Sequence, residues 1–162
     1  MKFHFILNPY AGKGNKIDFY STKIREVCEK EGLEYYIHET LGPREASEYV
    51  KAQLDASSEC QRFYSFGGDG TLNEILNGAI GYENAEIGLI PIGTGNDFCR
   101  NFTEKDNFFD IEKQIKGQAE KVDVLKYNDR YCMNMINVGF DCNAAYNTQA
   151  MKESPLIPNK LA

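Results

Sequence analysis

One stretch of sequence decides the fold of this chain: Phe66-Gly67-Gly68-Asp69-Gly70-Thr71-Leu72-Asn73-Glu74. It follows an apolar run at residues 62–66 whose aromatic content is typical of a β-strand. After it, apolar side chains recur at helical spacing, at Leu72, Ile75, Leu76, Ala79 and Ile80. The stretch therefore predicts a strand, a glycine-rich turn and an amphipathic helix in direct succession.

The residue types of this turn favour a bound anion. Glycine adopts positive φ at no steric cost and lets another group approach the backbone closely. Thr71 with Glu74 three residues later matches a capping box, which predicts that the helix begins at Thr71. A helix N-terminus presents free N–H groups and a partial positive charge, and both attract phosphate. The alternative is an ordinary tight turn that binds nothing.

The rest of the first 121 residues repeats the alternation of strand and helix. Apolar runs predict four strands, at residues 3–7, 34–39, 62–66 and 86–92. Helical spacing predicts three helices between them, from Ile17 to Gly32, from Pro43 through Leu54, and from Thr71 to about Gly78. Pro91 must lie at the end of its strand or at an unpaired position, because proline cannot donate to a ladder. Strands that alternate with helices predict an α/β fold with a parallel sheet.

The pattern changes near residue 122. Residues 122–127 and 130–138 have the composition of two strands, and Asn128-Asp129 between them suits a hairpin turn. A helix is expected from about residue 143 to residue 152. The sequence therefore predicts a first domain over 1–121 and the beginning of a second, antiparallel β domain over 122–162.

Composition limits the classes of partner. The 162 residues carry a net charge of −6, and 42% of them are hydrophobic, as in a globular protein. The negative charge argues against nucleic acid as a partner and against lasting attachment to anionic membranes, though not against transient contact. No apolar run is long enough to span a bilayer and no signal sequence is recognisable, so we expect a cytoplasmic location.

Metal-binding patterns of cysteine and histidine are weak. No C-x-x-C pair occurs among the five cysteines, which are Cys28, Cys60, Cys99, Cys132 and Cys142. The two histidines, His4 and His38, lie in strand-like runs and are assigned no role. No zinc site can be drawn from this set, and free thiols in a reducing compartment are expected.

Three polar turns each follow a predicted strand, at residues 8–13, 67–73 and 93–97. Loops at the carboxyl ends of parallel strands line one crevice, where ligands bind, so we expect the three turns to meet. Backbone N–H groups of the middle turn, at Gly68, Gly70 and Thr71, are suited to phosphate oxygens. Lys13 would add a positive charge.

Polar side chains in these turns supply further contacts. Asn73 and Asn96 offer amide groups for hydroxyls or base edges. Asp69 suits either Mg²⁺ beside phosphates or a hydrogen bond within its own loop. No histidine or carboxylate pair stands out as a general base, and Asp97 and Asp141 are candidates by position only.

Known phosphate-binding signatures do not fit. The P-loop pattern requires Lys followed by Ser or Thr, whereas Lys13 is followed by Gly14. The dinucleotide fingerprint requires a third glycine where this chain has Asn73. The chain is therefore neither a P-loop NTPase nor a clear Rossmann dehydrogenase.

Three ordered motifs together resemble the catalytic domain of the diacylglycerol kinase family, which includes bacterial lipid kinases and sphingosine kinases. They are Asn8-Pro9-x-Ala11-Gly12-Lys13-Gly14, Gly67-Gly68-Asp69-Gly70-Thr71-Leu72-Asn73-Glu74 and Pro91-x-Gly93-Thr94-Gly95-Asn96-Asp97-Phe98. Residues 137–141 resemble the next landmark of the family. The resemblance extends from residue 3 to the end of the chain.

The resemblance implies an α/β nucleotide-binding domain like that of NAD kinases and phosphofructokinases, followed by a β-sandwich. It implies transfer of the γ-phosphoryl group of ATP, with Mg²⁺, to a lipid hydroxyl. ATP would lie across the turn at residues 67–73. The nucleotide-binding residues implied are Asn8, Lys13, Thr40, Gly67, Gly68, Asp69, Gly70, Thr71, Leu72, Asn73, Thr94 and Asn96.

Members of this family continue for more than a hundred further residues, which carry the acidic general base, metal ligands and much of the lipid cleft. The general base is therefore expected beyond residue 162. We expect this chain to be a fragment that binds nucleotide and does not turn over alone. The edge of the hairpin at 122–138 is expected to promote self-association, giving a homo-oligomer.

Two alternatives remain at the level of sequence. A kinase of a soluble acceptor such as NAD would share the Gly-Gly-Asp-Gly turn, although the motif at 91–98 favours the lipid kinases. A non-catalytic nucleotide-binding module is the second alternative, because no general base is found. The sequence does not indicate which lipid is the acceptor.

Overall fold

The computed structural model describes residues 1–12, 16–136 and Cys142. Its centre is a parallel sheet with the strand order β2-β1-β3-β4. The strands are β1 (Lys2–Leu7), β2 (Tyr35–Glu39), β3 (Gln61–Gly67) and β4 (Ala85–Pro91). Their order along the chain alternates with helices, which confirms the predicted α/β fold.

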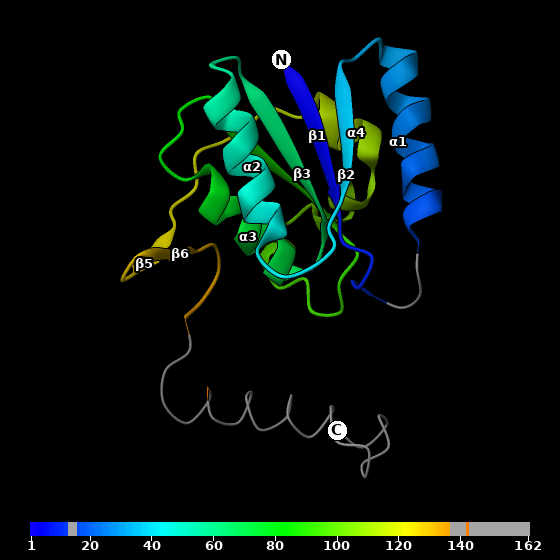
Figure 1. Ribbon diagram of the computed structural model, residues 1–162. Coiled ribbons are helices and arrows are strands. Elements are labelled where there is room, and N and C mark those ends of the chain that lie inside the picture. The colour runs from blue at the N-terminus through cyan, green and yellow to red at the C-terminus, as the bar shows by residue number, and fades with distance from the viewer. Residues whose placement is uncertain (13–15, 137–141, 143–162) are drawn as a thin grey trace.

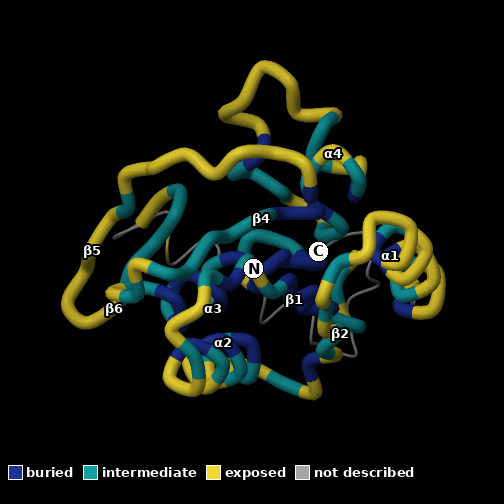
Figure 2. Tube along the Cα trace, turned by 90° about the horizontal axis from the view of Figure 1, so that it is seen from above, coloured by how far each residue is buried: buried dark blue, intermediate teal, exposed yellow. Residues whose placement is uncertain are grey.

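Helices cover both faces of the sheet (Figure 1). The α-helices are α1 (Ile17–Glu31), α2 (Glu45–Ala56), α3 (Asp69–Ala79) and α4 (Ile111–Lys116). One face of the sheet packs with α1 and α4, through a cluster that includes Phe5 and Tyr64. The other face packs with α2 and α3, through a cluster that includes Ile6 and Phe63. Figure 2 shows α2 and α3 together on one side and α4 on the other.

Burial on both faces explains why β1 and β3 appear in the sequence as continuous apolar runs. Neighbouring residues of a strand point to opposite faces, so Phe5 and Ile6 enter different clusters and both are fully buried. Pro91 is the last residue of β4, as predicted. Its missing N–H therefore interrupts no ladder.

The predicted helix ends agree with the structure in part. Gly32 follows α1 in the left-handed conformation, and its N–H bonds the carbonyls of Cys28 and Glu29, which confirms the predicted helix end. The second helix begins at Glu45 rather than at Pro43, because Arg44 before it has a positive φ of 70°.

The capping box predicted for the third helix is wrong. Helix α3 begins at Asp69, two residues before Thr71, and no side chain caps it. The hydroxyl of Thr71 instead accepts a hydrogen bond from Asn8 Nδ2 at 2.9 Å. A contact with a loop 63 residues away has replaced the local one, and the first turn of the helix remains uncapped.

Residues 98–116 form short helices that the sequence analysis did not predict. They are η1 (Phe98–Asn101) and η2 (Lys105–Phe109), both 3₁₀, followed by α4. These elements have four to six residues, too few for a helical period to be visible. Asp110 caps α4, because its side chain accepts a bond from the N–H of Lys113.

The predicted hairpin is present but shorter than expected. Its strands are β5 (Leu125–Tyr127) and β6 (Arg130–Cys132), paired antiparallel. Asn128 in the turn has a φ of 52°, a conformation that asparagine tolerates. Residues 133–136 are not strand, and the helix predicted at 143–152 lies outside the described residues.

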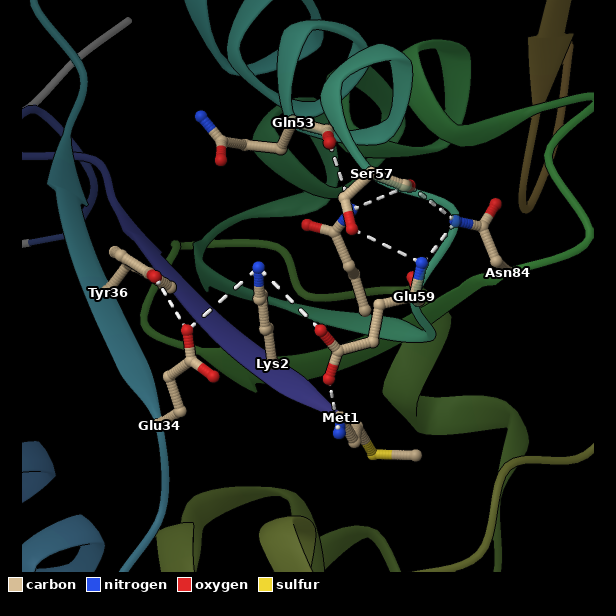
Figure 3. Close-up of polar contacts among 9 residues, drawn as sticks. Met1, Lys2, Glu34, Tyr36, Gln53, Ser57, Glu59 and Asn84 are labelled. Carbon is tan, nitrogen blue, oxygen red and sulfur yellow. Dashed lines mark hydrogen bonds and ion pairs between the residues drawn. The ribbon is translucent and has the colours of Figure 1, made fainter.

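Polar side chains close the amino edge of the sheet (Figure 3). The amino group of Met1 lies 2.9 Å from Glu59, and Lys2 Nζ lies 3.7 Å from the same carboxylate. Gln61 donates to the carbonyl of Gln53 at 2.9 Å. Asn84 donates to the carbonyl of Glu59 at 3.0 Å. Charges and main-chain carbonyls at this edge are thus paired within the protein.

Among the described helices, none has the length and apolar character needed to cross a membrane.

Candidate functional site

The three glycine turns meet at the carboxyl edge of the sheet, as the sequence predicts. Strands β2 and β3 flank β1 on opposite sides. The chain leaves β1 for a helix on one face and leaves β3 for a helix on the other, so the two loops diverge. This is the topological switch point of an open parallel sheet, the place where sheets of this class commonly bind ligands. Figure 1 shows these loops gathered at the lower end of the strands.

Asn8 joins the first turn to the second. Its main-chain N–H bonds the carbonyl of Phe66, and its side-chain Nδ2 donates to the Thr71 hydroxyl. The side-chain oxygen accepts from the N–H of Tyr10 at 2.9 Å. A Cβ atom on Gly67 would lie 2.3 Å from Thr71 Oγ1. Glycine is therefore required at position 67 by the packing of this threonine.

The third turn packs closely against the main chain of the other two turns. A Cβ atom on Gly93 would lie 2.4 Å from the Cα of Gly68. Gly12 has a φ of 75°, and a Cβ there would lie 2.3 Å from the carbonyl oxygen of Ile92. The protein's own packing requires glycine at both 93 and 12, because a side chain at either would drive two loops apart.

Two glycines of the central turn have a different environment. A Cβ on Gly68 would make ordinary contact, at 3.4 Å from Gly93, and a Cβ on Gly70 would meet nothing within 4 Å. Glycine in a helix is less stable than alanine by up to about 1 kcal/mol. The packing of the described residues does not demand glycine at position 70. Its presence leaves open space over the uncapped first turn of α3.

Asp69 joins the second turn to the third. Its two carboxylate oxygens accept hydrogen bonds from the N–H groups of Asp97 and Phe98, each at 3.1 Å. The sequence leaves two roles open for Asp69, a hydrogen bond within its own loop or a contact with Mg²⁺, and in the structure the carboxylate bonds a neighbouring loop. Among the residues that the structure describes, no group of three or more His, Cys, Asp or Glu side chains could hold a metal.

Two asparagine side chains at the site have unpartnered oxygens. Asn96 has a φ of 53°, and its Nδ2 donates to the carbonyls of Gly93 and Pro91 at 2.8 and 3.3 Å. Its Oδ1 is buried and meets no donor within the described structure, and the same holds for Asn73 Oδ1. A buried carbonyl oxygen without a donor costs free energy, so both atoms are suited to a ligand that donates hydrogen bonds.

The other expected site residues have varied environments. Thr40 is buried beside β1, and its N–H bonds the carbonyl of Leu7 at 2.9 Å. Leu72 points into an apolar cluster, so only its main chain can face a ligand. Thr94 is exposed in the third turn. Lys13 lies outside the described residues.

Of the two acids considered as general bases, Asp97 and Asp141, the structure describes only Asp97. Asp97 is half-buried, and its carboxylate pairs with Arg100 at 2.8 Å. Asp141 lies outside the described residues.

The two histidines lie in β1 and β2. His4 is stacked between Tyr36 and Phe63 on the α2 face of the sheet, and its Nδ1 lies 2.9 Å from the Tyr49 hydroxyl. Burial lowers the pKa of His4 to about 4, so the ring is neutral at pH 7. His38 stacks on Tyr49. Both rings belong to one aromatic cluster, which suits packing rather than catalysis.

Residues 2–127 match the family model described as "Diacylglycerol kinase catalytic domain". This chain belongs to that family. A diacylglycerol kinase of Staphylococcus epidermidis is 35% identical over 158 residues, covering 94% of this chain and 48% of the relative. One from Staphylococcus carnosus is 31% identical over 150 residues, covering 90% and 47%.

A solved structure agrees with this membership. The crystal structure of a diacylglycerol kinase from Bacillus anthracis superimposes with a TM-score of 0.64 at 30% identity, over 80% of this chain and 48% of that one. The chain spans about half the length of the relatives it matches. The remaining half of those relatives has no counterpart in this chain.

Within this diacylglycerol kinase domain, the contact that sequence reasoning missed is the bridge from Asp69 to the third turn. Its partners lie 28 and 29 residues further along the chain and donate through main-chain N–H groups. No residue type marks such a donor in the sequence. The spacing of the two motifs indicated only that both follow strands.

Proposed function

We propose that this chain is the nucleotide-binding part of a lipid kinase that transfers the γ-phosphoryl group of ATP to a lipid hydroxyl, with diacylglycerol as the acceptor class. One observation carries the proposal: the first turn of α3 is uncapped and has open space at Gly70. Such a helix end attracts phosphate through free N–H groups and the helix dipole.

Three loops would hold the nucleotide. Main-chain N–H groups at Gly68, Gly70 and Thr71 would bind phosphate oxygens. The unpartnered Oδ1 atoms of Asn73 and Asn96 would accept bonds from ribose hydroxyls or base amino groups. Asn8 and Asp69 keep the loops at fixed separation, and Lys13 would add charge.

Magnesium would be held chiefly by the phosphates of the nucleotide, with at most a contribution from Asp69, because the described residues offer no set of acidic ligands. When bound, the ion neutralises charge that develops on the transferred group. The chain's own contribution is to position the donor and exclude water from it. Proton abstraction from the lipid hydroxyl would need an acid beyond residue 162.

Calorimetry with Mg·ATP tests the binding site. Wild-type chain is expected to bind weakly, and Gly68→Val is expected to abolish binding, because the added side chain would start 3.4 Å from the Cα of Gly93 and push the third turn away from the second. Ser58→Val, at the exposed amino edge, is the matched control and should leave affinity unchanged. Unchanged affinity in a folded Gly68→Val variant would exclude the proposed site.

Acceptor assays separate the lipid kinase from its alternatives. The protein is supplied with labelled ATP and either diacylglycerol in micelles or NAD. Label in phosphatidic acid supports the proposal, and label in NADP alone would overturn it. This chain alone is expected to bind nucleotide without transfer to either acceptor, so the transfer assay is run on a form extended to the full length of the relatives.

A lipid acceptor also implies transient contact with a membrane surface from a cytoplasmic location. Self-association through the hairpin remains part of the proposal, because every residue of β5 is exposed. Sedimentation at several concentrations measures it.

A further inference from the structure

One amide side chain connects α3 to the hairpin. Asn77 Nδ2 donates to the carbonyl of Tyr131 at 2.8 Å, and the N–H of Tyr131 donates to Asn77 Oδ1 at 2.9 Å. These are the two bonds that a neighbouring strand would make with Tyr131. The side chain therefore takes the place of a strand at the outer edge of β6.

Strand geometry explains why Tyr131 is available. In an antiparallel pair, opposite residues alternately exchange both main-chain bonds and point those groups outward. Tyr131 lies opposite Lys126 at the middle of the three-residue pairing. Its N–H and C=O point outward, toward Asn77. Without Asn77, both groups would lose their protein partner.

The hairpin has little other support. All three residues of β5 are exposed, and an isolated two-stranded hairpin is marginally stable in water. Beyond the Asn77 bonds, Met133 packs against the apolar cluster that contains Leu72 and Leu89. Leu72 directly follows Thr71 of the central turn. The hairpin is thus held on the same helix that begins at the proposed phosphate site.

The same amide also reaches back toward that site. Asn77 Nδ2 donates to the carbonyl of Asn73 at 2.7 Å. Asn73 is the residue whose buried Oδ1 has no partner in the described structure. One nitrogen therefore links the end of the central turn with β6, the second strand of the predicted second domain.

We propose that Asn77 is a positioning residue that fixes the hairpin Leu125–Cys132 on α3, and so sets where the acceptor part of the enzyme begins relative to the donor phosphate. This inference rests on the proposed function for its catalytic consequence, whereas the link itself is independent of it. Asn77 does not contact the reacting atoms.

Amide hydrogen exchange, followed by NMR, tests the link in the chain as it stands. Asn77→Ala is expected to speed exchange at Tyr131 at least about tenfold, because two hydrogen bonds are lost. Exchange at Ile75 and Leu76 should stay within about twofold of wild type, and so should the dissociation constant for Mg·ATP. Asn77→Asp keeps the acceptor for the Tyr131 N–H and should give a smaller increase.

Asn101→Ala is the matched control. Asn101 also bonds a residue that follows β6, because its Nδ2 donates to Asn134 Oδ1 at 3.2 Å, but this contact is exposed. Asn101→Ala should therefore leave amide exchange at Tyr131 unchanged. Equal exchange at Tyr131 in wild type and Asn77→Ala would overturn the link, and so would faster exchange throughout the sheet.

The positioning role predicts different effects of Asn77→Ala on kcat and on KM for ATP. In the form that phosphorylates diacylglycerol, Asn77→Ala should lower kcat at least about tenfold and leave KM for ATP within about twofold. An unchanged kcat in a variant with fast exchange at Tyr131 would overturn the positioning role. Failure of wild type to bind ATP would instead overturn the proposed function, and the exchange result would still decide the link.

Discussion

The amino and carboxyl edges of the central sheet differ in how their polar groups find hydrogen-bond partners. At the amino edge, side chains pair with each other and with main-chain carbonyls, as Glu59 does with Met1 and Gln61 does with Gln53 (Figure 3). At the carboxyl edge, glycines bring main chains together, while a helix end and two amide oxygens remain without partners among the described residues.

The difference between the two edges supports the proposal of a ligand at the carboxyl edge. Buried polar groups are normally satisfied within the protein, and an edge that leaves several unsatisfied suits a ligand that completes them. The amino edge stabilises the fold, and the carboxyl edge carries the proposed nucleotide site. Substitutions at the amino edge should therefore change stability without changing nucleotide affinity, whereas substitutions that separate the turns at the carboxyl edge should change both.

The largest effect is expected at Gly93. Gly93→Ala would place Cβ 2.4 Å from the Cα of Gly68, so two backbones must separate. We expect a loss of about 2–3 kcal/mol in the free energy of unfolding and a large loss of affinity for Mg·ATP. Urea denaturation and calorimetry measure the two quantities.

Gly70→Ala is the control for Gly93. The added Cβ would meet no neighbouring atom within 4 Å. The substitution should raise the free energy of unfolding by up to about 1 kcal/mol, because alanine favours the helix more than glycine does. Equal stability of Gly93→Ala and wild type would mean that the turns do not need this close contact.

An intermediate effect is expected at Gln61 on the amino edge. Its side chain is buried and satisfies the carbonyl of Gln53 at the end of α2. Gln61→Leu should lower the free energy of unfolding by about 1–3 kcal/mol, because that carbonyl loses its donor. Affinity for Mg·ATP should not change in calorimetry.

Gln53→Leu tests the interpretation of the Gln61 result. The bond from Gln61 reaches the main chain of residue 53, so this substitution keeps the acceptor. Gln53→Leu should lower the free energy of unfolding much less than Gln61→Leu does. A lower nucleotide affinity in folded Gln61→Leu would contradict the separation of the two edges.

The smallest effect is expected at Glu59. The amino group of Met1 lowers the pKa of Glu59 below 4.5, and Glu59 raises the pKa of that amino group above 8.0. The pair therefore stabilises the fold fully between about pH 4.5 and 8. Its contribution falls as Glu59 is protonated at lower pH and as the amino group loses its proton at higher pH.

Glu59→Gln should lower the melting temperature by less than about 2 °C at pH 6.5, because the pair is exposed to solvent. The difference from wild type should shrink at both pH extremes, as followed by thermal scans across pH. A difference in melting temperature that grows as the pH falls would contradict the assigned pairing.

Much of this fold could be predicted from sequence because its strands are buried on both faces. β1 and β3 carry apolar side chains in succession, and this signal is local. Gly32 and Pro91 mark ends through their own backbone chemistry, which is also local. The short helices between Phe98 and Lys116 carried no such signal, because each is about one turn long.

The candidate site also has features that could be predicted from the sequence and features that could not. Thr71 and Glu74 met the local rule for a capping box, yet a hydrogen bond from Asn8 overrode it. Asp69 was recognised as a polar residue in the turn, but its acceptance of two main-chain bonds from the third turn was not foreseen. The number and order of the turns were predictable, and their mutual contacts were not.

The sequence by itself determined the α/β class, the three turns after their strands and the resemblance to diacylglycerol kinases. Each of these depends on residues close together in the chain. The tertiary structure decided the sheet order β2-β1-β3-β4, the role of each glycine and the link from Asn77 to Tyr131. These depend on contacts between distant segments, which exist only once the chain has folded.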